Sequence, residues 1–131
     1  MADIIKIDSK NIINFLHNPA SVSLEKPFSQ QIFLIEAHIA GTTHIDGIED
    51  IEPNLLDGMK LRFVREADNQ YDSLAILIRD HDGNKLGYVP RNKNEILSRL
   101  MDAGKLVYGT IYKKERLDNW LKITIQIFMD E

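Results

Sequence analysis

The sequence predicts a mainly β fold of the α+β class: a small, partly open antiparallel β-barrel with one or two helices, one of them inserted between strands. Three observations support this prediction. Short apolar segments with strand-like patterns recur along the chain and are separated by turn-forming residues. Two pairs of these segments lie close enough in sequence to form hairpins. One helical pattern interrupts them, which favours an inserted helix over the regular strand–helix alternation of a parallel sheet.

The composition is that of a globular domain with one core: 131 residues, 44% hydrophobic and 27% charged. No apolar segment approaches the roughly 20 residues that cross a bilayer, and the first residues lack the apolar stretch of a secretory signal. The chain has no cysteine, which excludes disulfides, thiol nucleophiles and Cys-based zinc sites. We therefore expect a cytoplasmic protein with no membrane partner.

Charge is unevenly distributed on this acidic chain. The net charge of −4 argues against a protein that coats DNA without specificity. Residues 41–59 contain no Lys or Arg, whereas basic residues cluster in 60–93, so a small electropositive groove is compatible with the overall charge. The acidic residues of the first segment are Asp46, Glu49, Asp50, Glu52 and Asp57; the basic ones of the second are Lys60, Arg62, Arg65, Arg79, Lys85, Arg91 and Lys93.

Residues 1–28 are expected to form a peripheral segment, and residues 29–131 the barrel domain. A short helix is predicted over 10–16, with Asp8 or Ser9 as its cap and Pro19 beyond its end. The first strand is predicted over 31–40 and ends at Gly41. The following residues, 41–54, are expected to form a long loop.

The central strands carry the clearest patterns. Residues 59–65 alternate between apolar and basic side chains, as a half-buried strand requires. Segments 74–78 and 85–89 flank Asp82 and Gly83, a typical hairpin turn.

A helix follows these strands, with Asn92 or Asn94 as its cap, Ile96, Leu97, Leu100 and Met101 as its apolar face, and Gly104 at its end. Two closing strands, 106–115 and 120–128, are expected to be joined by a turn at 116–119.

No pattern indicates catalysis. The chain has no phosphate-binding glycine loop, and its histidines stand outside any metal-binding spacing. Pairs such as His44 with Asp46 are more simply solvated turn residues, although a hydrolase with a metal at this pair is a remote alternative. We therefore expect no enzyme, no metal and no cofactor.

The polar segment between the second and third predicted strands carries more chemistry than a turn needs. An exposed Tyr71 beside Asp72 can stack on a ring while the carboxylate accepts a hydrogen bond, which suggests a binding site; a well-made turn is the simpler interpretation. Tyr88 and Trp120 lie at strand ends. There an aromatic ring can either stack on bases or pack over the barrel rim, and these alternatives are about equal.

These motifs together resemble the HIRAN domain family. The similarity rests on N-Q-Y-D at 69–72, L-G-Y-V-P-R at 86–91, A-G-T-T-H at 40–44 and D-A-G-K at 102–105, and it covers roughly residues 31–129. It implies an OB-like barrel and a non-enzymatic module that captures the 3′ end of single-stranded DNA. It also implies a DNA-repair setting, with a repair ATPase or nuclease as a partner in trans.

Carried over residue by residue, the resemblance assigns a role to each matching position. Tyr71 would stack on the terminal base, Asp72 would accept a hydrogen bond from the 3′-hydroxyl, and Asn69 would hold that nucleotide. Tyr88 would line the groove and Arg91 would contact a phosphate. Trp120 would flank the bases, and His44 stands where DNA-binding members carry an end-stacking aromatic residue.

This chain departs from the family pattern in ways that reduce the expected affinity for DNA. Thr43 replaces an arginine, Ser73 and Leu74 replace a pair that usually ends in asparagine, and residues 46–57 are acidic. Each lost phosphate contact lowers affinity. We therefore expect weak binding of single-stranded DNA ends. The alternative is a protein- or peptide-interaction module with little DNA affinity.

Overall fold

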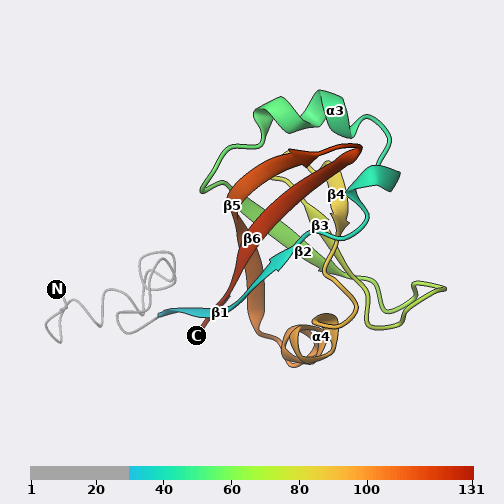
Figure 1. The fold of residues 1–131 in the computed structure, drawn as a ribbon. Coiled ribbons are helices and arrows are strands. Elements are labelled where there is room, and N and C mark those ends of the chain that lie inside the picture. Colours follow the sequence, from blue (N-terminus) through green and yellow to red (C-terminus); the bar gives the residue numbers. More distant parts are fainter. Residues whose placement is uncertain (1–29) are drawn as a thin grey trace, which may run out of the picture. The chain divides into compact units, whose positions relative to one another are not determined.

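The computed structural model describes residues 30–131, of which Gln31–Glu131 form one compact unit (Figure 1). The helix predicted over 10–16 lies outside the described residues. Six antiparallel strands form one sheet in the order β1-β6-β5-β2-β3-β4. Their bounds are β1 Gln31–His38, β2 Lys60–Arg65, β3 Ile76–Arg79, β4 Lys85–Tyr88, β5 Leu106–Leu117 and β6 Trp120–Asp130.

The sheet curls until its two edges meet. Just after β1, Ala40 pairs with Tyr88 of β4 through two backbone hydrogen bonds, of 2.8 and 2.9 Å. Helix α4 (Asn94–Asp102) is inserted between β4 and β5 (Figure 1). The predicted fold, a mainly β antiparallel barrel with an inserted helix, is confirmed.

Gly87 makes this closure possible. A Cβ atom at this position would lie 2.4 Å from the carbonyl oxygen of Ala40 and 2.6 Å from Cγ2 of Ile39. The φ angle of Gly87 is 148°, which L side chains rarely adopt. Glycine is therefore required where β4 approaches the end of β1.

The core follows the alternation seen in the sequence. In β2, Leu61 and Phe63 are buried, whereas Lys60 and Arg62 are exposed. In β6, the apolar side chains at alternate positions are all buried: Leu121, Ile123, Ile125 and Ile127. Each such fully buried side chain contributes about 1.5–3 kcal/mol.

Residues 41–54 form short helices, and the prediction of a plain loop is wrong. The segment contains η1 (Thr42–His44), α3 (Ile48–Ile51) and η2 (Glu52–Asn54). Tertiary contacts stabilise it: the Thr42 hydroxyl donates to the carbonyl of Leu121 at 2.7 Å, and Ile48 is buried. Lys114 donates to the carboxylate of Glu52 at 2.6 Å. The sequence of this segment does not indicate these contacts, because their partner residues lie far along the chain in β5 and β6.

Two details of the turns and caps also differ from prediction. Neither Asn92 nor Asn94 caps α4: Lys93 occupies the cap position and makes no side-chain cap bond. Asn94 is the first residue of the helix, and its side-chain amide bonds another partner described below. The β5–β6 turn is shorter than predicted: Leu117 pairs with Trp120, so only two residues separate the strands.

Across residues 30–131, none of the helices has both the length and the apolar character that a bilayer crossing demands.

Candidate functional site

The loop that joins β2 to β3, residues 66–75, is a closed and internally bonded structure. Its base is held by the carbonyl of Ala75, which accepts from the backbone N–H of Glu66 and from the Arg65 guanidinium, both at 3.0 Å. We call it the β2–β3 loop. Third-strand pairing begins only at Ile76, because the N–H groups of Leu74 and Ala75 donate to Asp72 instead.

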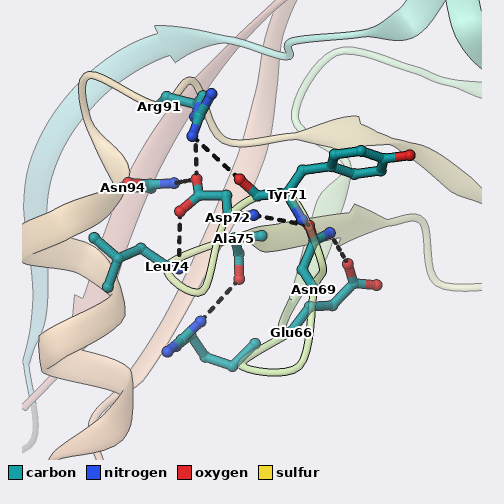
Figure 2. Close-up of polar contacts among 9 residues, drawn as sticks. Glu66, Asn69, Tyr71, Asp72, Leu74, Ala75, Arg91 and Asn94 are labelled. Atoms are coloured by element: carbon teal, nitrogen blue, oxygen red, sulfur yellow. Dashed lines mark hydrogen bonds and ion pairs between the residues drawn. The ribbon is translucent and has the colours of Figure 1, made fainter.

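Asn69 organises the loop from within. Its side-chain oxygen accepts from the backbone N–H groups of Tyr71, at 2.8 Å, and Asp72, at 3.0 Å. Its side-chain amide donates to Glu66 at 3.1 Å (Figure 2). Asparagine favours such local bonds to the backbone. The oxygen of Asn69 is thus occupied in fixing the backbone that carries Tyr71 and Asp72.

The Asp72 carboxylate is held in one orientation by three donors. Oδ1 accepts from the Leu74 N–H, while Oδ2 accepts from the Asn94 side chain, both at 2.9 Å. The Arg91 Nε lies 3.4 Å from Oδ2. The Leu74 bond first, and then the Asn94 bond, lowers the pKa of Asp72 below its ordinary 3.8. Asp72 is therefore an ionised acceptor at neutral pH, and Oδ1 keeps a lone pair for a further donor.

Tyr71 presents its ring to solvent. Its side chain is 81% exposed, and Figure 2 shows the ring extending away from the bonded side chains of the loop. Its carbonyl accepts from Arg91 at 3.3 Å, and the Arg91 side chain is itself 78% exposed. An open aromatic face, a fixed carboxylate and an accessible guanidinium thus share one surface.

Glu66 connects the β2–β3 loop to the strand that closes the barrel. Its Oε1 accepts from the Tyr88 hydroxyl at 2.8 Å as well as from Asn69. Burial, followed by the hydrogen bond to Glu66, raises the pKa of Tyr88 above 10.0. Tyr88 thus remains a neutral donor, and its backbone is fixed by the bridge to Ala40.

Helix α4 is fixed at one end to the β2–β3 loop and at the other to the last residue of β2. Asn94, its first residue, bonds Asp72, and Asp102, its last, accepts two hydrogen bonds from Arg65 at 3.0 and 3.1 Å. The Arg65 bonds lower the pKa of Asp102. Sequence reasoning overlooked the link from Asn94 because an asparagine at a helix start is usually a cap; the proximity of the L-G-Y-V-P-R motif was the only available sign.

The predicted site residues divide into two groups. Asn69, Tyr71, Asp72, Tyr88 and Arg91 belong to one connected network, through Glu66. The other three predicted residues have no hydrogen bond or ion pair to the β2–β3 loop within residues 30–131: Thr43, His44 and Trp120.

Trp120 packs at the β5–β6 turn, where its ring contacts the His38 ring edge-on at 5.7 Å. His44 and Asp46 line an open hollow together with Arg79 and Lys85. Two cations in that lining disfavour a bound metal ion. In the part of the chain that the structure describes, no three His, Asp or Glu side chains are grouped as metal ligands.

The acidic segment 46–57 lies away from the β2–β3 loop. Figure 1 shows α3 at one end of the barrel, whereas the loop that follows β2 projects from the other end, near α4. Phosphate groups that approach Tyr71 are therefore not opposed by this segment at close range.

The profile of the HIRAN domain matches residues 32–130. The chain belongs to the HIRAN domain family. This HIRAN domain is similar to a Lactobacillus plantarum protein of known crystal structure, with 27% identity, a TM-score of 0.72, and coverage of 79% of this chain and 98% of the other. A comparison with curated protein sequences gives no match.

The fold is also that of the HIRAN domain of human HLTF. Its crystal structure is 16% identical with a TM-score of 0.60, covering 76% of this chain and 78% of the other. The NMR structure of the HLTF HIRAN domain in its DNA-bound conformation is also 16% identical, with a TM-score of 0.54. The match covers 76% of this chain and 79% of the other.

Proposed function

We propose that this HIRAN domain is a non-enzymatic module that binds single-stranded DNA and recognises its 3′-hydroxyl end. The observation that carries the proposal is the exposed Tyr71 ring beside the fixed, ionised carboxylate of Asp72. The DNA-bound conformation of a HIRAN domain with the same fold supports nucleic acid as the ligand class.

The carboxylate supplies the end recognition. Ionised Asp72 accepts a hydrogen bond from a free hydroxyl but repels a phosphate at the same position. A strand interior, which carries a phosphate on its 3′ oxygen, is thereby disfavoured. The Asn94 and Leu74 bonds leave the acceptor direction of Oδ1 set before the ligand arrives.

The other residues hold the nucleotide next to this acceptor. Tyr71 provides a stacking face for the terminal base, worth about 1–3 kcal/mol. Arg91, mostly exposed and close to Asp72, is placed to contact the backbone phosphate of that nucleotide. The internal bonds of Asn69 make it a positioning residue for Tyr71 and Asp72, and Tyr88 holds Glu66 in the same network.

A fluorescence anisotropy titration at low salt tests the proposal. Oligonucleotides with a 3′-hydroxyl should bind more tightly than the same sequences with a 3′-phosphate. Tyr71→Ala should weaken binding by about 5–150-fold, which corresponds to the loss of one stacked base. Tyr112→Ala, at a half-exposed tyrosine of β5, is the matched control and should leave the affinity unchanged. Equal affinity for the two 3′ ends would refute end recognition.

The alternative function, a protein- or peptide-interaction module, would be favoured by an acidic segment folded over the Tyr71 surface. That segment lies at the other end of the barrel (Figure 1). The alternative predicts no detectable binding of oligonucleotides even at low salt, where electrostatic contacts are strongest.

A further inference from the structure

A second surface of the domain is hollowed and basic. An open hollow lies between the segment that begins at η1 and the β3–β4 hairpin; we call it the hairpin hollow. Its charged lining consists of Arg79 and Lys85 against the single carboxylate of Asp46. A net positive lining is unexpected on a chain of charge −4, directly beside the acidic segment.

The two cations of the hollow are available to a ligand. No ion pair joins Arg79 or Lys85 to a carboxylate anywhere in residues 30–131. One N–H of the Arg79 guanidinium donates to the carbonyl of Gly83 at 2.6 Å, which fixes the side chain. Arginine has five N–H donors, so four remain. The Asn84 amide and the His44 imidazole add neutral polar groups to the same lining.

The strand register places these cations on the same face of the hairpin as Tyr88. Arg79 pairs with Lys85 and Leu77 pairs with Tyr88, and directly opposed residues of an antiparallel pair share a face. Leu77 and Arg79 are two residues apart and therefore also share a face. A register shift between Ile78 and Arg79 allows Lys85 and Tyr88, three residues apart, to do the same.

The charge of Arg79 also reaches the Tyr88 hydroxyl, where it acts to lower the pKa against the larger effects of burial and Glu66. The β2–β3 loop precedes β3 and the hairpin hollow lies at the end where β3 turns into β4, so the two sites lie toward opposite ends of this hairpin, with Tyr88 on the face between them.

We propose that the hairpin hollow is a second subsite, which binds a backbone phosphate of the strand whose 3′ end lies at Tyr71 and Asp72. The inference rests on the proposed function for the direction of the strand. A fixed guanidinium with free donors beside a lysine matches the geometry and charge of a phosphate group. The strand would run from Tyr71 past Tyr88 to Arg79 and Lys85, and the hollow would supply charge that Thr43 does not.

The test compares Lys85→Gln with Lys105→Gln. Both lysines are exposed and both variants lose one charge, but Lys105 follows α4 and lies outside the hollow. Affinity for a long 3′-hydroxyl oligonucleotide is measured across a salt series. Lys85→Gln should reduce the slope of log K against log salt by about 0.7, the value for one phosphate contact on a single strand. Lys105→Gln should leave the slope unchanged, and both should keep the 3′-hydroxyl preference.

The outcomes separate this inference from the proposed function. If the 3′-hydroxyl is preferred but the two variants have equal slopes, the hollow is not a subsite and end recognition stands. If no end is preferred but Lys85→Gln alone lowers the slope, the hollow binds backbone phosphate and end recognition fails. Absence of oligonucleotide binding overturns both. Binding of inorganic phosphate that depends on Lys85, with no change in the oligonucleotide slope, would identify a site for free phosphate and overturn the subsite.

Discussion

Gly87→Ala should destabilise the domain strongly, because the barrel closes at this residue. A Cβ atom would lie 2.4 Å from the Ala40 carbonyl oxygen and 2.6 Å from Ile39 Cγ2. To relieve these clashes, the backbone at Ala40 and the fully buried side chain of Ile39 would have to move. Overpacking of this kind costs about 1–3 kcal/mol. A non-glycine residue in a sparsely populated backbone region costs about 1–3 kcal/mol more. The expected loss is therefore about 2–6 kcal/mol, a large fraction of the stability of an ordinary domain.

Gly58→Ala separates the two contributions. Gly58 also has a positive φ, 86°, but no atom lies within 4 Å of the Cβ that alanine would add. This variant should therefore lose only the backbone contribution. Urea unfolding measures both variants, and with a slope of about 2 kcal/mol per molar urea the midpoint of Gly87→Ala should fall by roughly 1–3 M. Equal midpoints for the two variants would refute the steric argument for barrel closure.

Three further predictions concern the hydrogen-bond network of Asp72 and Tyr88. The pKa of Asp72 is lowered in the folded state, so ionised Asp72 stabilises the fold. This contribution to the free energy of unfolding is complete above the ordinary pKa of 3.8 and is lost as pH falls through the lowered pKa. The 3′-hydroxyl preference should thus be constant from neutral pH down to that value. Asn94→Ala removes one donor and should raise the pKa of Asp72, measured by NMR titration of its carboxyl carbon; an unchanged pKa would contradict the role of Asn94. Glu66→Ala should lower the pKa of Tyr88 toward 10.0, measured by ultraviolet titration of tyrosinate with Tyr88→Phe as reference, and no change would contradict the network.

The strands and the inserted helix were predictable because their patterns are local. Alternation in 59–65 and 120–128 reports burial on one face of a strand, whatever the partner strand is. The turn at Gly83 and the helix end near Gly104 also depend on neighbouring residues alone. The HIRAN motifs also predicted the family, and the profile match over residues 32–130 confirms it.

The short helices of 41–54 were missed for a physical reason. Their stabilising contacts come from residues far away in the sequence, such as Thr42 with Leu121 and Lys114 with Glu52. Local composition in this segment is polar and contains two glycines, which favours a loop when those distant partners are unknown.

The candidate site was likewise predictable only in part. The residues of the β2–β3 loop were identifiable because a tyrosine, a carboxylate and an amide are excessive for a turn, and their roles in DNA binding stay a prediction. Two contacts depend on the path of the chain through space: Asn94 orients Asp72 from 22 residues away, and the Tyr88 hydroxyl donates to Glu66. Sequence patterns thus determine which segments form strands and which chemical groups are present. Only the tertiary structure decides which of those groups meet, because long-range contacts depend on barrel closure.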